Sequence, residues 1–227
     1  MISEYSGVNI IGSTGNFLAE FNEEELRYAS VDEIAARYIS DIEEGVGDQK
    51  IKAGQIKCAT SLRVIHPVEY KTLDASVIAQ KKTNAPIWVH HGGILGVEIA
   101  HYLESKGADL SKVILGHTDR NPDHYEHLKI AKTGINLSVD NLARVVRYPV
   151  QENIDVIKNL LDNGFLEHIF ISADFGRYTY YKSYGGGPGL EYILGTFVPR
   201  LQEQLGLSQA EIETLFVHSP QRVFCQF

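Results

Sequence analysis

Short apolar runs alternate with amphipathic helical patterns along this 227-residue chain. The alternation is typical of parallel βα units, because two parallel strands need a long crossover connection and a helix usually supplies it. Six strand-like runs are predicted, over residues 8–12, 55–59, 87–90, 113–116, 136–139 and 169–172. The pattern therefore predicts an α/β fold with one parallel sheet whose helices lie outside it.

Helical patterns fill the gaps between these runs. Ser30 followed by Glu33 predicts a capping box that opens a helix to about residue 44, and Pro122 stands where an N1 proline would open a helix through residue 132. Further helices are predicted over about 68–82, 97–105, 153–163, 192–205 and 208–217, with a Tyr- and Gly-rich loop over 175–189. No linker or repeat divides the chain, so we expect residues 1–227 to form one domain.

Composition narrows the class of protein. The 29 acidic against 21 basic side chains give a net charge of −8, which argues against a sequence-independent grip on nucleic acid or on an anionic membrane. Cys58 and Cys225 are too few for a disulfide framework, and the sequence shows no signal-peptide pattern and no apolar run near the ~20 residues that span a bilayer. We therefore expect a cytoplasmic protein that binds neither nucleic acid nor membrane.

Four side chains that can bind metal stand where predicted strands end. They are Lys57 in AGQIKCAT, His90 in PIWVHHGG, His117 in VILGHTDR and Asp174 in IFISADFGR. The carboxyl ends of parallel strands meet at one edge of a sheet or barrel, where active sites of such folds lie. Imidazole and carboxylate suit zinc, manganese, cobalt or iron. A lysine fits such a site when burial keeps its amine neutral and carbon dioxide carbamylates it.

The order AGQIK, PIWVHH, ILGHTD and SADFGR resembles the phosphotriesterase family of the amidohydrolase superfamily, from about Gly7 to the end of the chain. The resemblance implies a (β/α)8 TIM-barrel in which Lys57 is a carbamylated lysine that bridges two metals. It also implies that His90 and His117 bind the second metal, and that Asp174 binds the first and acts catalytically by moving a proton. The implied activity is that of a zinc-dependent hydrolase in which a metal-bound hydroxide attacks a lactone or ester.

The segment from Asp174 to Tyr180 refines the expected substrate. Its spacing Asp174-x-x-Arg177-x-x-Tyr180 resembles the branch of that family that acts on phosphorylated sugar lactones, where the Arg and Tyr bind the substrate phosphate. Arginine suits this bidentate task, and Lys182 could add a second positive charge. We therefore favour a phosphorylated lactone over an organophosphate triester. From the residues alone, Arg177 could equally pair with a loop carboxylate, and Tyr180 could pack in the barrel mouth.

One part of the family pattern has no counterpart in this sequence. The family's first strand supplies an H-x-H pair, and none of the nine histidines forms that spacing. Numbering the strands by the resemblance makes the run at 8–12 the third, so we expect a barrel truncated to strands three to eight. Its exposed edges could let copies of the chain associate as a homo-oligomer. Members of the family bind two metal ions, whereas this chain could bind one metal ion or none.

Whether the chain is an enzyme is therefore open at this point. The alternative to a lactonase is a non-catalytic truncated barrel that binds at most one metal or a phosphorylated ligand. Among the other polar residues, His91 faces away from His90 and is expected in a supporting or loop position, and Asp119 could either order His117 or cap a turn. Surface positions are expected for the remaining histidines: His66, His101, His124, His127, His168 and His218.

Overall fold

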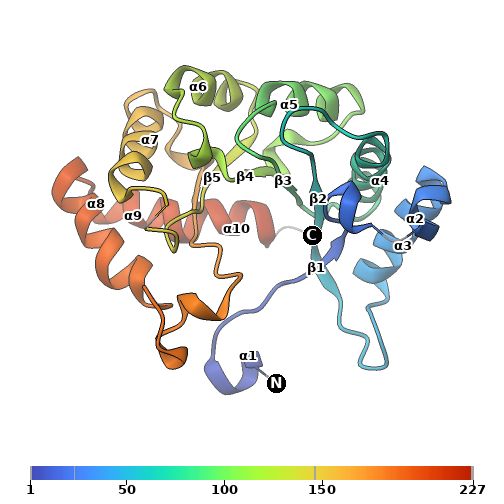
Figure 1. The fold of residues 1–227 in the computed structure, drawn as a ribbon, viewed down its shortest axis with the longest axis horizontal. Helices are drawn as coiled ribbons and strands as arrows, with labels where there is room; N and C mark the ends of the chain where they lie inside the picture. Colours follow the sequence, from blue (N-terminus) through green and yellow to red (C-terminus); the bar gives the residue numbers. More distant parts are fainter. Residues whose placement is uncertain (1, 23, 146, 226–227) are drawn as a thin grey trace.

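The structure is a computed structural model that describes residues 2–22, 24–145 and 147–225. At its centre lies a six-stranded parallel sheet whose strand order follows the chain (Figure 1). The strands are β1 (Gly12–Gly15), β2 (Ala53–Ala59), β3 (Ile87–His90), β4 (Val113–Gly116), β5 (Asn136–Val139) and β6 (Ile169–Ile171). The expected α/β barrel-type architecture is confirmed, with β1 and β6 at the two edges of the sheet.

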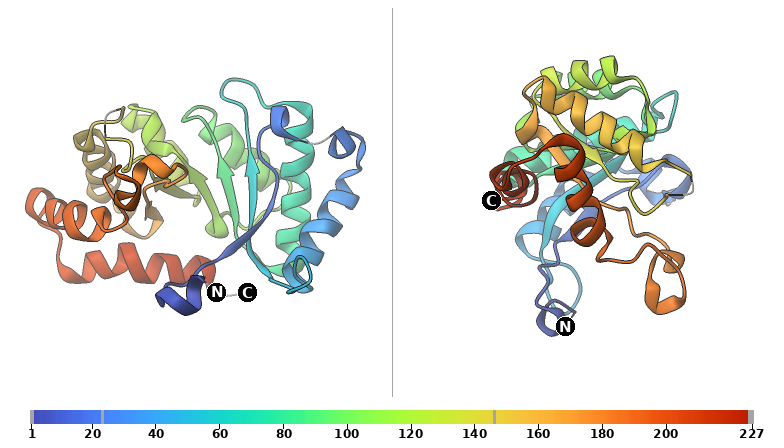
Figure 2. Two further views of the ribbon diagram at one scale, coloured as in Figure 1. Left: turned by 60° about the horizontal axis from the view of Figure 1, so that its bottom comes forward. Right: turned by 90° about the vertical axis from the view of Figure 1, so that its left-hand side faces the viewer.

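Helices cover the outside of the curved sheet, as Figures 1 and 2 show. Between β1 and β6 they are α2 (Glu24–Tyr28), α3 (Val31–Glu43), α4 (Pro67–Thr83), α5 (Gly96–Ser105), α6 (His124–Lys132) and α7 (Val150–Asp162). A short α1 (Ile2–Ser6) precedes the sheet, and α8 (Val198–Leu205), α9 (Gln209–Glu213) and α10 (Ser219–Phe224) follow it. Two π-helical segments, Ile193–Phe197 and Thr214–His218, adjoin these last helices.

Several predicted element starts were wrong: the helix expected from residue 153 begins at Val150, and the strand expected from residue 55 begins at Ala53. The first strand was expected over 8–12 but begins at Gly12, because Val8, Ile10 and Ile11 are apolar yet 60%, 56% and 46% exposed. The helix expected to start at Pro122 begins at His124, because the Asp123 side chain caps it by accepting from the backbone N–H groups of the next turn. The capping box of Ser30 and Glu33 is confirmed.

The alternation of side chains along each strand divides the sheet into two faces. One face packs on the helices and forms the main core, which includes Ile56, Cys58, Val89, Leu115 and Leu137. The opposite, inner face carries Lys57 on β2 and, across the ladder from it, Trp88 on β3. A smaller cluster of Ile114, Phe170 and Val223 closes one end of this inner face. The folding pattern thus places the chemically active side chains on the inner face.

Arg222 on α10 ties the starts of three strands together. Its guanidinium donates to the carbonyl of Ser111 at 2.9 Å, to Oδ1 of Asn136 at 2.7 Å and to the carbonyl of Glu167 at 2.8 Å. These acceptors lie at or just before the first residues of β4, β5 and β6. Figure 2 shows the C-terminal helices crossing this end of the sheet. The opposite, carboxyl ends of the strands are left to form a site.

Gly15 allows β1 to approach β2 closely beside Lys57. Its φ is +116°, and a Cβ at this position would lie 1.8 Å from the carbonyl oxygen of Lys57. We expect Gly15→Ala to lower the free energy of unfolding by more than about 2 kcal/mol, since the left-handed backbone and the clash both oppose a side chain. Urea denaturation measures the change.

The matched control for this prediction is Gly12→Ala on the same strand. A Cβ there would make an ordinary contact, 3.5 Å from the carbonyl oxygen of Lys52, and Gly12 does not have a positive φ. We expect its unfolding midpoint to stay near that of the parent protein. Equal midpoints for Gly15→Ala and Gly12→Ala would contradict the proposed role of the close approach.

No helix among the described residues is at once long enough and apolar enough to traverse a bilayer.

Candidate active site

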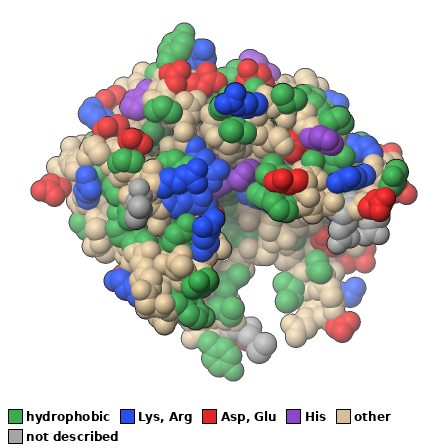
Figure 3. Space-filling model, in the orientation of Figure 1, with side chains coloured by type: hydrophobic (Ala, Val, Ile, Leu, Met, Phe, Trp, Pro, Cys, Tyr) green, Lys and Arg blue, Asp and Glu red, His purple; other side chains and the backbone are tan. Residues whose placement is uncertain are grey.

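The four predicted ligands lie together at the carboxyl ends of the strands. Lys57, His90, His117 and Asp174 line one cavity of about 440 Å³, which we call the ligand cavity. Its other lining residues are Phe17, Gln55, Trp88, Arg120, Asp140, Arg144 and Ser172. Figure 3 shows Lys and Arg side chains gathered beside a histidine on the hollowed face of the molecule. The four predicted ligands, up to 117 positions apart in the sequence, therefore share one site.

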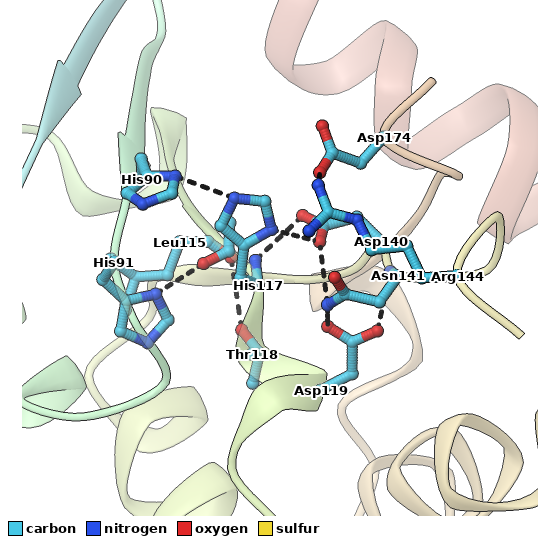
Figure 4. Close-up of polar contacts among 11 residues, drawn as sticks. His90, His91, Leu115, His117, Thr118, Asp119, Asp140, Asn141, Arg144 and Asp174 are labelled. Carbon is cyan, nitrogen blue, oxygen red and sulfur yellow. Dashed lines mark hydrogen bonds and ion pairs between the residues drawn. The ribbon is translucent and has the colours of Figure 1, made fainter. Parts of the chain in front are cut away.

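His90 and His117 present their ring nitrogens to each other. Nδ1 of His90 lies 2.8 Å from Nε2 of His117, and the rings meet edge to face (Figure 4). Burial, helped by the neighbouring His117 and Lys57, lowers the pKa of His90 to about 3. Burial and the nearby Arg120 likewise lower the pKa of His117. Both imidazoles are therefore neutral near pH 7, which is the form that binds metal.

Asp140, which directly follows β5, fixes the orientation of His117. Its Oδ1 lies 2.6 Å from Nδ1 of His117, and its Oδ2 accepts the backbone N–H of the same residue at 2.8 Å. With the proton of His117 held on Nδ1 by this carboxylate, Nε2 is left with its lone pair toward His90. Burial raises the pKa of Asp140. The pairing prepares His117 to donate electrons from Nε2.

Asp119, rather than contacting His117, supports the neighbouring loop. Its carboxylate accepts the backbone N–H of Asn141 at 2.8 Å and the Nδ2 of the same side chain at 2.6 Å. Asp119 thus orders the surroundings of His117 indirectly. It holds Asn141, which is the neighbour of Asp140 in the chain. The direct contact with the histidine belongs to Asp140.

Lys57 meets the physical requirement for a neutral amine. Burial lowers its pKa, while Cys58, Asp140 and Asp174 act in the opposite direction. Its Nζ lies 5.7 Å from the centre of the Trp88 ring. A lowered pKa makes the uncharged amine more accessible, and that is the form that reacts with carbon dioxide.

Asp174 is paired with a cation. Its Oδ2 accepts from Nη2 of Arg144 (Figure 4). The backbone is left-handed at both Asp174 and His117, with φ of +48° and +67°. Such a conformation disfavours residues other than glycine and is often found at functional sites. The fold thus holds two of the four predicted ligands in strained positions.

The donor set fits a divalent metal in part. The rings of His90 and His117 are neutral and present nitrogens to each other, and Asp140 orients the ring of His117, as metal-binding imidazoles require. Over the described ranges, no three His, Cys, Asp or Glu side chains come together closely enough to hold a metal by themselves. Asp174 could become a further ligand once its carboxylate is no longer paired with Arg144. Lys57 could become another once its amine is carbamylated.

A second pocket adjoins the ligand cavity and contains the predicted substrate-binding residues. Arg177 and Tyr180 line this space of about 280 Å³, which we call the arginine pocket. It is further lined by Ala143, Arg144, Val145, Arg147, Thr179 and Gly187. Arg144 lines both spaces. Lys182, considered as an additional cation, instead pairs with Glu191.

Nearly the whole chain matches a known protein family. The model of the phosphotriesterase family matches residues 1–224. The chain belongs to the phosphotriesterase family.

Similar members of the phosphotriesterase family come from several bacteria. The phosphotriesterase homology protein of Escherichia coli is 32% identical over 221 residues, covering 96% of this chain and 75% of that protein. The phospho-furanose lactonase of Mycoplasmopsis synoviae is 34% identical over 237 residues, covering 96% of this chain and 67% of that protein. Across the relatives compared, the chain spans 63% to 75% of their length.

Solved structures of the family have the same fold. The crystal structure of the E. coli protein, complexed with phosphate in its active site, has a TM-score of 0.94 and covers 98% of this chain and 77% of that one, at 32% identity. A lactonase from Listeria monocytogenes has a TM-score of 0.91 at 33% identity, with 98% and 75% coverage.

Some residues of this phosphotriesterase-family site were not predicted. Asp140 directly follows β5, as His117 directly follows β4, so the same strand-end signal could have found it. Arg144 and Arg147 lie in a loop without periodic pattern and gave no such signal. The surface position predicted for His127 was wrong, since its ring is buried and its Nε2 lies 3.2 Å from the carbonyl of Thr118. His91 is also buried and contacts the carbonyl of Gly116.

Proposed function

We propose that this chain is a metal-dependent hydrolase that opens lactones carrying a phosphate group. The observation that carries the proposal is that the ligand cavity and the arginine pocket, which are lined by different kinds of residue, share Arg144 in their walls. The ligand cavity presents neutral imidazoles, a buried lysine and a carboxylate. The arginine pocket beside it is lined by three arginines, Arg144, Arg147 and Arg177. A small substrate could therefore place its reacting carbonyl in one and an anionic group in the other.

In this proposal Lys57, carbamylated, would hold a divalent metal together with His90, His117 and Asp174, and zinc is the metal we expect. Such a metal supplies Lewis acidity and the activation of water at neutral pH. The residues of the chain position the reaction. Asp140 keeps Nε2 of His117 unprotonated, and Asp174 would pass a proton to the alkoxide oxygen that leaves as the lactone ring opens.

The cations next to the cavity favour a phosphorylated substrate over a triester. Arginine binds phosphate through two parallel hydrogen bonds, whereas a triester has no anionic oxygen for such a contact. Thr179 and Tyr180 line the same pocket, and their hydroxyl groups could donate to further phosphate oxygens. Relatives named phospho-furanose lactonase, 34% identical to this chain, support the same substrate class.

The proposal is tested by comparing one furanose lactone with and without its phosphate, using zinc-loaded protein. We expect kcat/KM to be higher for the phosphorylated lactone. Arg177→Met should lower kcat/KM for that substrate by roughly 10–100-fold, the effect of losing a charge-assisted hydrogen bond. The matched control is Arg200→Met, whose guanidinium donates to the exposed Gln151 away from both pockets.

Each alternative outcome has a defined meaning. Equal kcat/KM for both lactones would contradict a phosphate site in the arginine pocket. Binding of the phosphorylated lactone without turnover would instead favour the non-catalytic alternative, a barrel that retains phosphate recognition alone.

A further inference from the structure

We propose that Arg144 couples the two spaces of the site: an anion in the arginine pocket draws the Arg144 guanidinium away from Asp174 and frees that carboxylate. The inference rests on the proposed function, because it assigns the arginine pocket to an anionic group and the Asp174 carboxylate to the metal. It adds that the two ligands bind cooperatively. Arg144 is thereby a positioning residue, which acts through Asp174.

The contacts of Arg144 carry this inference. It lines both the ligand cavity and the arginine pocket, and its Nη2 donates to Oδ2 of Asp174. Its Nε is buried and has no hydrogen-bond partner among the described residues. Figure 4 shows the guanidinium between Asp174 and the loop that follows β5. The side chain is therefore held at one end of its guanidinium and has a donor left to offer.

Electrostatics explains why an anion would compete for this guanidinium. Arg147 and Arg177 line the same pocket of about 280 Å³, so three cationic residues border a small space. Among the described residues, Arg144 is the one of the three that forms an ion pair with a carboxylate, that of Asp174. A phosphate dianion could accept from all three, with better charge balance than one carboxylate provides. Its binding would thus favour a position of Arg144 that is turned away from Asp174.

The same pairing limits what Asp174 can do. While its carboxylate accepts from Arg144, the oxygen that accepts is not free to bind a metal, and the adjacent guanidinium repels a cation. Thermodynamic linkage makes the effect reciprocal. A metal that binds Asp174 would release Arg144 to the anion, and the anion would in turn raise metal affinity.

The coupling can be measured without any metal, by titrating metal-free protein with inorganic phosphate in a calorimeter. We expect Asp174→Asn to tighten phosphate binding by about tenfold, within the usual range of coupling between sites. Arg144→Gln should weaken phosphate binding, and Asp174→Asn should have no further effect in that background. Such a double-mutant cycle isolates the Arg144–Asp174 term.

Arg147→Gln is the matched control in the same pocket. Arg147 lies one turn further along the loop, where its backbone N–H donates to the carbonyl of Arg144, and it lines the arginine pocket but not the ligand cavity. We expect Arg147→Gln to weaken phosphate binding yet to preserve the tightening caused by Asp174→Asn. Thermal unfolding of each variant, with Arg144→Lys as a charge-preserving companion, shows that the comparison is made on folded protein.

A second readout is zinc affinity without phosphate, measured by competition with a chromophoric chelator. Arg144→Gln should raise zinc affinity by about tenfold, because Asp174 is no longer paired. Arg200→Gln, outside both pockets, should leave it at the parental value.

Several results would overturn the inference. If Asp174→Asn tightened phosphate equally in the Arg144→Gln background, removal of a nearby negative charge would explain the effect without Arg144. An unchanged phosphate affinity in Asp174→Asn would also overturn it. No phosphate binding by the parent protein would overturn both the coupling and the proposed phosphate site. Coupling observed in a protein that fails to open lactones would support the inference and refute only the proposed catalysis.

Discussion

Replacing His117 with alanine is expected to abolish lactone hydrolysis by the zinc-loaded protein. Zinc affinity should fall by more than the ~10–100-fold that loss of an outer partner of a metal ligand costs. The reason is that His117 and His90 face each other at 2.8 Å and form the one converging pair of neutral nitrogens identified in the site. Chelator competition and kcat/KM measure the two effects.

The fold should survive this change. Asp140 loses the imidazole but still accepts the backbone N–H of residue 117 and the Nδ2 of Asn141, so its buried carboxylate keeps partners on both oxygens. His101→Ala, on the exposed side of α5, is the control for loss of an imidazole elsewhere and should leave zinc affinity unchanged. Parental zinc affinity in His117→Ala would remove His117 from the ligand set, and with it the proposed metal centre.

Replacing Arg222 with methionine is expected to give a large loss of stability. The variant loses three hydrogen bonds from a charged donor, to Ser111, Asn136 and Glu167, and leaves their oxygens without this partner. We expect the free energy of unfolding to fall by about 2–3 kcal/mol. For a chain of this size the melting temperature should drop by roughly 5–10 °C. Calorimetry and urea denaturation measure both quantities.

Arg200→Met again provides a matched comparison, because that guanidinium donates to the exposed side chain of Gln151. Its melting temperature should change little, as is usual for surface positions. If Arg222→Met and Arg200→Met had the same melting temperature, the contacts of Arg222 with the strand starts would contribute little to the stability of the sheet.

The central strands could be predicted to the residue, whereas the first strand could not. The segments β3 (IWVH) and β4 (VILG) are short and mostly apolar, so hydrophobicity marks them. The segment β5 (NLSV) alternates polar and apolar residues, so its period of two marks it. The strand β1 is Gly-Ser-Thr-Gly and has no such pattern. Its position is set by backbone pairing with β2 and by the space that Gly15 leaves at Lys57. The apolar residues before it, Val8, Ile10 and Ile11, mislead because they are exposed.

Site residues that lie in or at the ends of strands could be predicted from the sequence. Residues placed in the site by contacts between distant segments could not. Lys57 and His90 occupy inner-face positions that period-2 alternation gives directly. That Arg144 pairs with Asp174, thirty residues further along, depends on how the loop after β5 folds over the sheet. His127 lies on an otherwise polar-looking helix, and which side of α6 faces the protein was not evident from its sequence.

The left-handed backbone at His117 and Asp174 means that both residues adopt a conformation that their residue types disfavour. Each such residue disfavours the folded state by roughly 1–2 kcal/mol relative to glycine. Selection for heat resistance alone would therefore tend to replace these two residues with glycine and would erase the proposed chemistry while the protein became more robust. Thermostability and activity in this chain should be improved by changes elsewhere, with both positions held fixed.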